Sequence, residues 1–138
     1  MVVRVGVDEF LSKLSEEIPY YRLLGMRIVE AGDGRATLKM NVEEKHFQPQ
    51  GAVHGGALAS IADAAGAIAL FTLANSGELV TTVELKVNFT SPVKGGEVLA
   101  KGKVVHRGRT IGVCEVDVVN EGKLAAKALA TYLFLKST

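Results

Sequence analysis

Residues 55–75 read Gly-Gly-Ala-Leu-Ala-Ser-Ile-Ala-Asp-Ala-Ala-Gly-Ala-Ile-Ala-Leu-Phe-Thr-Leu-Ala-Asn, and Asp63 is the one charged side chain in this run. The run is far too long for a strand, and it is rich in alanine, the residue with the highest helix propensity. The sequence therefore predicts a central helix over residues 55–75. Because a helix that is apolar all round must be covered by protein, the rest of the chain has to wrap it.

A membrane span is the alternative for this segment, since about twenty apolar residues cross a bilayer. An aspartate near the middle costs about 2.5–3.5 kcal/mol on insertion scales, and the flanking Lys or Arg residues typical of spans are missing. The remaining segments also have the alternation of amphipathic strands. We therefore expect a buried helix and no membrane partner.

Strand-like segments before and after the helix supply its cover. Alternating apolar and polar residues predict a hairpin over residues 26–31 and 35–42. Four strands follow the helix, separated by glycine-bearing turns: 79–89, 97–106, 110–120 and 123–135. We expect an α+β fold in which a curved antiparallel sheet surrounds one long helix. In the first of the four strands the residues predicted to face the helix are Leu79, Val83, Leu85, Val87 and Phe89, and those predicted to face away are Thr82, Glu84, Lys86 and Asn88.

The N-terminal part of the chain predicts one further helix. Asp8 is a good N-cap, and apolar residues recur at helical spacing until Pro19, so the helix is expected over residues 9–17. Residues 20–25 are expected to form a short packed connector. No export signal is visible at the N-terminus.

Length and composition limit the kinds of protein this can be. The 138 residues suit a single domain over 1–138. A net charge of +1 lacks the basic excess needed to bind a phosphate backbone, so we expect no nucleic acid partner. A single cysteine, Cys114, fits a reducing compartment, and we expect a cytoplasmic protein. No spacing typical of metal ligands or nucleotide-binding loops occurs, so neither metal nor cofactor is expected.

His54-Gly55-Gly56 opens the predicted helix and is the first candidate for chemistry. Free N–H groups and the positive end of the helix dipole meet negative charge there, and glycine lets a ligand approach the backbone. An N–H aimed at a carbonyl oxygen stabilises the oxyanion formed on attack by about 2.7–4 kcal/mol, as thioester hydrolysis requires. The alternative is a plain loop-to-helix transition capped by His54.

Asp63 is the second candidate, because no Lys or Arg lies three or four residues away on the same helix face. It is either a general base or nucleophile, or a structural carboxylate that accepts hydrogen bonds from a distant strand. Gly55 and Asp63 are eight residues apart, roughly 12 Å along a helix axis. They cannot act on one carbonyl within a subunit, so we expect a dimer with shared active sites related by a twofold axis.

Four segments together resemble the hotdog-fold acyl-CoA thioesterases of the phenylacetate-pathway, PaaI-like type: Gln48-Pro49-Gln50-Gly51-Ala52-Val53-His54-Gly55-Gly56, Asp63, Val87-Asn88-Phe89-Thr90-Ser91-Pro92 and His106-Arg107-Gly108-Arg109. The resemblance spans about residues 20–135. It implies a hotdog fold, hydrolysis of acyl-CoA to free acid and CoA, and a homodimer assembled into a tetramer.

The resemblance also implies a role for each matching residue. The Gly55 N–H would hold the thioester oxygen, and Asp63 of the partner subunit would activate water or attack directly. Gln48, where this family more often has Asn, would position water or the carbonyl, and Thr82 would orient the nucleophile. Residues expected to contact the substrate are His54 and Gly56 in the turn, and Asn88, Arg107 and Arg109 beside CoA. The rival functions are a non-catalytic acyl-CoA-binding module and a hotdog hydratase or dehydratase, and the acyl group stays open.

Overall fold

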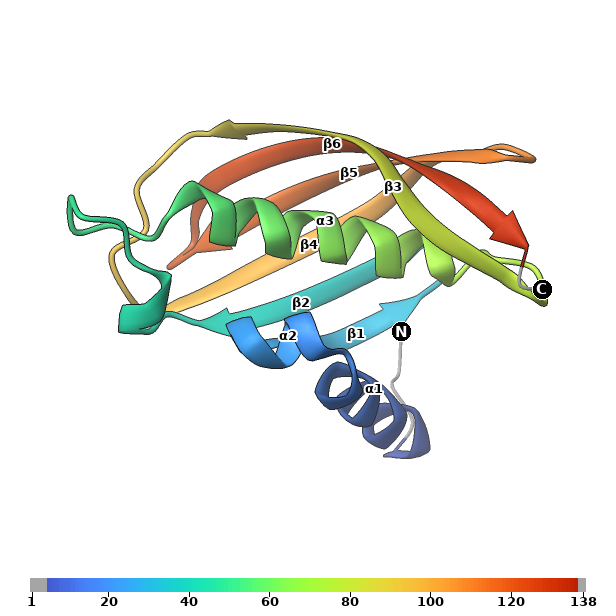
Figure 1. The fold of residues 1–138 in the computed structure, drawn as a ribbon, viewed down its shortest axis with the longest axis horizontal. Coiled ribbons are helices and arrows are strands. Elements are labelled where there is room, and N and C mark those ends of the chain that lie inside the picture. The colour runs from blue at the N-terminus through green and yellow to red at the C-terminus, as the bar shows by residue number, and fades with distance from the viewer. Residues whose placement is uncertain (1–4, 137–138) are drawn as a thin grey trace.

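The computed structural model describes residues 5–136, and it shows an antiparallel sheet of six strands curled around one long helix (Figure 1). In chain order the elements are α1 (Val5–Glu17), α2 (Pro19–Leu24), β1 (Met26–Gly32), β2 (Arg35–Asn41), the short 3-10 helix η1 (Glu44–His46), α3 (Gly55–Phe71), β3 (Glu78–Phe89), β4 (Glu97–Arg107), β5 (Ile111–Asn120) and β6 (Lys123–Lys136). The strands lie side by side in the order β1-β2-β4-β5-β6-β3. The predicted α+β architecture is confirmed.

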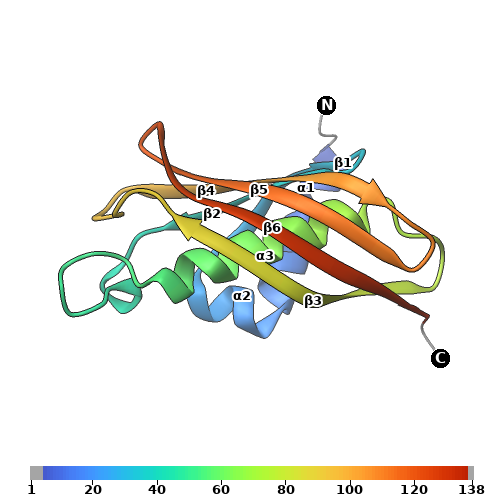
Figure 2. The same cartoon turned by 90° about the horizontal axis from the view of Figure 1, so that it is seen from above.

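Helix α3 forms the centre of the core. The sheet curves over one side of α3, and α2 lies on the opposite side (Figure 2). Ile61, Ala62, Ala65 and Ala69 have no exposed surface. Within residues 5–136, no helix combines the length and the apolarity that crossing a bilayer requires. The uniformly apolar run is therefore explained by protein packed around most of its circumference.

Glycines let α3 approach the sheet more closely than side chains would allow. A Cβ placed on Gly102 of β4 would lie 2.6 Å from the carbonyl oxygen of Ala65, and one on Gly112 of β5 would lie 2.5 Å from the side chain of Leu70. Both distances are shorter than any van der Waals contact. The backbone of α3 therefore rests almost directly on β4, and the Leu70 side chain of α3 rests on the backbone of β5.

The N-terminal helices differ from the prediction. Helix α1 begins at Val5, so Asp8 lies inside the helix and does not cap it. Residues 19–24 form helix α2, which the sequence analysis took for a connector. Pro19 was read as a stop signal, but proline is favourable in the first turn of a new helix, and Gly25 ends α2 in the left-handed conformation (φ 77°).

Helix α3 ends at Phe71, four residues earlier than predicted. The Thr72 hydroxyl donates to the carbonyl of Ala69 (2.6 Å) and accepts the N–H of Gly34 (2.8 Å), which ties this end of the helix to the β1–β2 turn. The chain continues through turns at Leu73 and Ala74 before β3 begins. A bond to a distant hairpin ends the helix, and helix propensity gives no sign of it.

Strand β3 does not keep the simple alternation that the sequence predicts. A β-bulge between Thr82 and Glu84 shifts the register against β6, so side chains change face at this point. Thr82 therefore faces α3, whereas Val83 (60% exposed) and Leu79 (52% exposed) do not. The predicted orientation of Thr82, Val83 and Leu79 was wrong. After the bulge, Leu85 and Val87 pack against the core as predicted.

We expect Gly102→Ala to lower the free energy of unfolding by about 1–3 kcal/mol, the usual cost of overpacking, because its Cβ would push Ala65 and the helix away from β4. Urea denaturation measures this. Gly95→Ala is the matched control, since nothing lies within 4 Å of a Cβ there. Equal stability of the two variants would contradict the close seating of α3.

Candidate active site

The first half of the candidate site is the turn that opens α3. His54 adopts an extended conformation (φ −59°, ψ 135°), and its Nδ1 accepts the N–H of Gly56 (2.8 Å). A Cβ on Gly56 would lie 2.9 Å from this Nδ1, so glycine leaves room for the imidazole cap. Within the described part of the chain the N–H of Gly55 has no hydrogen-bond acceptor. His54 thus satisfies the second amide of the helix and leaves the first one free.

The free Gly55 amide belongs to a cavity of about 380 Å³. Gln48 and Gly55 line one part of it, and Phe89 with residues 90–93 lines another. The side-chain carbonyl of Gln48 accepts the N–H of Gln50, which fixes the amide group in its loop. The Phe89 ring lies 3.0 Å from where a Cβ of Gly55 would be. A polar amide, a free N–H and an aromatic ring therefore share one cavity.

Buried His46 holds this turn in place. Its Nδ1 accepts the N–H of Glu43 (2.9 Å), and its Nε2 donates to the carbonyl of Leu24 (2.7 Å). Its own backbone carbonyl accepts the N–H of His54 (2.7 Å). Neutral imidazole is the form that accepts at one nitrogen and donates at the other. His46 thus joins the end of α2 to the turn before α3.

Asp63 is the second half of the candidate site. It lines a separate cavity of about 330 Å³ between α2, α3 and β3, together with Tyr20, Tyr21 and Thr82. The Thr82 hydroxyl donates to Oδ1 of Asp63 (2.8 Å). Among residues 5–136 no basic side chain forms an ion pair with Asp63. The carboxylate is held by a neutral hydroxyl donor.

Two tyrosines near Asp63 are shifted towards their protonated forms. Burial, reinforced by the negative charge of Asp63, raises the pKa of Tyr21 to about 12. Burial likewise raises the pKa of Tyr132 far above its usual range, with a smaller contribution from Asp63. Both phenols therefore remain hydrogen-bond donors at any physiological pH. Burial raises the pKa of Cys114 to about 12, so this thiol is no nucleophile.

Gly55 and Asp63 do not meet within the chain. The two cavities have no lining residue in common. The two residues lie on one straight helix, eight positions and roughly 12 Å apart. The free N–H and the carboxylate therefore lie in two separate cavities of the chain.

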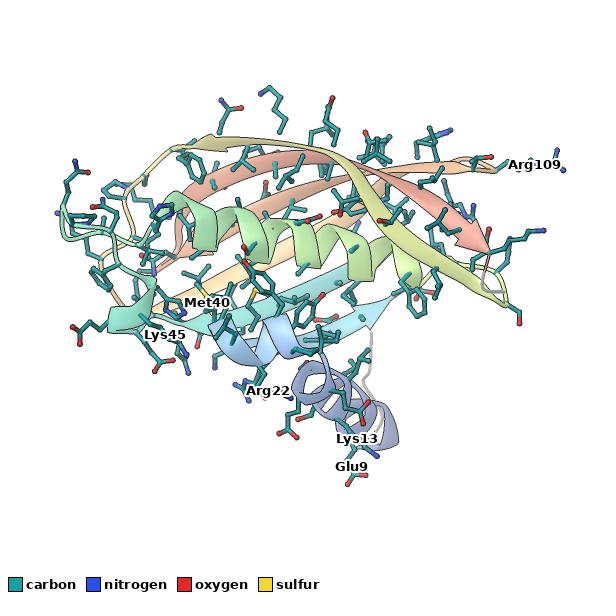
Figure 3. All side chains as sticks on the ribbon, in the orientation of Figure 1. Glu9, Lys13, Arg22, Met40, Lys45 and Arg109 are labelled. Atoms are coloured by element: carbon teal, nitrogen blue, oxygen red, sulfur yellow. The ribbon has the colours of Figure 1, made fainter. Side chains whose placement is uncertain are left out.

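Three of the predicted substrate contacts, Asn88, Arg107 and Arg109, line neither cavity. The oxygen of the Asn88 side chain accepts a hydrogen bond from Lys86 (2.6 Å) on exposed surface. Arg107 pairs with Glu78 (2.6 Å) and stacks on Phe134, 3.6 Å from the ring centroid. Arg109 is exposed in the β4–β5 turn, and Figure 3 shows it extending from the tip of the molecule.

Three side chains near Asp63 could have been predicted from the sequence but were not. Tyr20 and Tyr21 were assigned to a connector, and Tyr132 was given no role. A signal for Tyr132 was present, since β6 places it in an inward row with Ala128 and Ala130. A buried phenol needs a hydrogen-bond partner, and α3 is the element that this row faces.

The sequence profile of the thioesterase superfamily matches residues 50–126, more than half of the chain. The chain belongs to this superfamily. Thioesterases of the PaaI-like type have the hotdog fold, and the sheet wrapped around α3 is that fold. The resemblance drawn from the sequence is confirmed, and the protein is an enzyme that hydrolyses thioesters.

Relatives with similar sequences or structures span nearly the whole thioesterase. Human acyl-coenzyme A thioesterase 13 is 30% identical over 130 residues, which cover 91% of this chain and 92% of the relative. A thioesterase from Haemophilus influenzae superposes with a TM-score of 0.88 at 26% identity, covering 97% of this chain and 94% of that one. A variant of the phenylacetic acid degradation protein PaaI from Thermus thermophilus gives 0.78 at 29% identity, covering 85% and 99%.

We expect His46→Phe to lower the free energy of unfolding of the thioesterase by about 2–4 kcal/mol, because it leaves the Glu43 N–H and the Leu24 carbonyl unpaired. Thermal and urea denaturation measure the change. His106→Phe is the control, since His106 is exposed and the same exchange should cost less than about 0.5 kcal/mol there. Similar losses in the two variants would contradict the role of His46.

Proposed function

We propose that this thioesterase hydrolyses acyl-CoA esters, with Gly55 of one subunit and Asp63 of another acting on the same carbonyl. The observation that carries the proposal is that one helix has both a free N–H, at its start, and a carboxylate without an ion-pair partner in the described structure, farther along. The similarity to human acyl-coenzyme A thioesterase 13 supports the choice of CoA as the thiol.

Gly55 would bind the thioester oxygen. Its N–H lies at the positive end of the α3 dipole, so it stabilises the negative charge that develops on this oxygen during attack. Gln48 lines the same cavity, and its side-chain carbonyl is engaged by the loop, which leaves its NH₂ group as a second donor. His54 and Gly56 would keep the turn in shape.

Asp63 would supply the nucleophile. As a general base it takes a proton from water, the water oxygen bonds to the carbonyl carbon, and the carbon–sulfur bond breaks to release CoA thiolate, which is then protonated. As a nucleophile, the carboxylate itself displaces the thiolate, and water then hydrolyses the resulting anhydride. The Thr82 hydroxyl orients the carboxylate in either route.

A second copy of the chain would bring the two half-sites together. Strand β3 pairs with β6 along one side and is an open edge along the other in the described structure, and long open edges readily pair with another chain. Thr82 lies beside the Asp63 cavity and Phe89 lies beside Gly55. If two β3 strands pair antiparallel about a twofold axis between Leu85 and Lys86, Thr82 lies opposite the partner's Phe89. The Asp63 cavity of each subunit then lies beside the Gly55 cavity of the other.

The surface contacts to CoA also stay predictions. Arg109 is exposed and free to meet a phosphate, whereas Arg107 would first have to leave Glu78. Asn88 lies on the same strand as Phe89, close to the Gly55 cavity. Assembly of two dimers into a tetramer and a cytoplasmic location are further predictions from the sequence.

We expect Asp63→Asn to lower kcat for acyl-CoA hydrolysis by about 10²–10⁴-fold, the usual contribution of an acid–base group. Asparagine still accepts the Thr82 hydrogen bond, so the fold should be kept. Release of free thiol from a panel of acyl-CoA esters measures the rate. Asp117→Asn is the control, since this carboxylate pairs with Lys127 on the surface. Undiminished turnover in Asp63→Asn would refute the role of Asp63.

Gly55→Pro tests the free amide, because proline removes the N–H yet is favoured at the first helical position and tolerates the extended His54 before it. We expect kcat to fall by about 10²–10³-fold. Gly55→Ala is the matched control, because it adds a Cβ against Phe89 but keeps the N–H. Equal rates for the two variants would show that the amide does not bind the oxyanion.

Mixing the Gly55→Pro and Asp63→Asn proteins tests the shared site. After random exchange of subunits, half of the dimers are mixed and each has one complete site, so about a quarter of the wild-type activity should return. Activity is measured before and after exchange. No recovery in dimers proven to be mixed, or full activity in a proven monomer, would refute the shared site.

A further inference from the structure

Tyr132 is a fully buried polar side chain that the proposed reaction does not use. It lies on β6, and its phenol reaches across the core to α3. There it donates a hydrogen bond to the backbone carbonyl of Asp63 (2.8 Å). A helix carbonyl already accepts the N–H four residues later, so the phenol adds a second bond at the residue that carries the carboxylate.

Tyr132 and Thr82 hold the same residue from two neighbouring strands. They are direct cross-strand partners in the β3–β6 ladder. Thr82 donates to the carboxylate of Asp63, and Tyr132 donates to its main-chain carbonyl. The bulge immediately after Thr82 turns this threonine towards α3, so both donors come from one rung of the sheet.

A glycine on α3 leaves the space that this phenol occupies. Gly66 lies three residues beyond Asp63, and a Cβ there would overlap the Tyr132 hydroxyl. The orientation of the phenol towards Asp63 is therefore fixed by packing against α3 as well as by the hydrogen bond.

We propose that Tyr132 is a positioning residue for hydrolysis. By donating a hydrogen bond to the main-chain carbonyl of Asp63, it fixes the position of this residue along the α3 axis and its rotation about that axis, and so the point at which the carboxylate meets Thr82 and the substrate. This inference rests on the proposed role of Asp63. The Asp63 carboxylate must reach a carbonyl held by another subunit, so its position has to be set within its own subunit. A misplacement of about 1 Å can cost on the order of 10²-fold in rate.

The variant Tyr132→Phe keeps the ring and removes the hydrogen bond. We expect kcat to fall by roughly tenfold, a fraction of what a 1 Å misplacement costs, while KM stays unchanged because the buried ring cannot touch substrate. Cys114→Ala is the matched control: the Cys114 thiol is buried and donates to the carbonyl of Gly66 (3.3 Å), three residues farther along α3. It should lose stability and keep kcat within about twofold.

A double-mutant cycle separates positioning from general stability. If Tyr132 and Thr82 act through the orientation of Asp63, their effects on kcat are coupled, so Tyr132→Phe should cost much less in a Thr82→Val background. Cys114→Ala should show no such coupling. Should Tyr132→Phe fold poorly, Gly66→Ala displaces the phenol from the helix side and should lower kcat in the same way.

The outcomes distinguish this inference from the proposed function. Loss of activity in Asp63→Asn with unchanged kcat in Tyr132→Phe would overturn the role of Tyr132 and leave Asp63 in place. Equal loss of kcat in Tyr132→Phe and Cys114→Ala, or additive effects with Thr82→Val, would also overturn it, because stability alone would then explain the change. Full activity in Asp63→Asn would refute the proposed role of Asp63, on which this inference rests.

Discussion

The close contact of α3 with the sheet is the constraint on which the rest of the structure depends. Gly102 allows the helix backbone to rest on β4, and Gly112 leaves room on β5 for the Leu70 side chain of the helix. At this height a phenol from β6 and a hydroxyl from β3 can both reach Asp63. The alanines of α3 have the same effect from the other side, because short side chains keep the layers close. The packing of the core and the positions of the groups that hold Asp63 therefore both depend on the distance between α3 and the sheet.

The chemistry is divided along the helix. One end of α3 presents the free N–H of Gly55. His54 caps the turn that carries this N–H, and buried His46 anchors the turn. The middle presents Asp63, held by hydroxyl donors and by no cation in the described structure. This division suits the proposal that a complete site needs two chains, which would pair along the open edge of β3.

Most of the architecture could be predicted from the sequence, because it follows from local patterns. A charge-poor, alanine-rich run specifies a buried helix, and alternating residues specify the strands around it. Elements set by local signals agree closely: the predicted hairpin strands 26–31 and 35–42 are observed as Met26–Gly32 and Arg35–Asn41. The isolated aspartate and the His-Gly-Gly turn could also be identified from the sequence. A charge or a backbone N–H that is removed from water without a partner costs free energy, so such groups are candidates for function. The eight-residue separation then predicted two half-sites from helix geometry alone.

What the sequence determined by itself was thus the family, the order of the strands around the central helix, and the two unusual points on that helix. The tertiary structure decided everything that depends on contacts between distant segments. Thr72 ends α3 through a bond to the β1–β2 turn, and the bulge after Thr82 brings this threonine to Asp63. Tyr132, 69 residues beyond Asp63, reaches the same point from β6. Periodicity records which face of its own strand a residue occupies, but a bulge or a bond between remote residues is fixed only when helix and sheet are packed together.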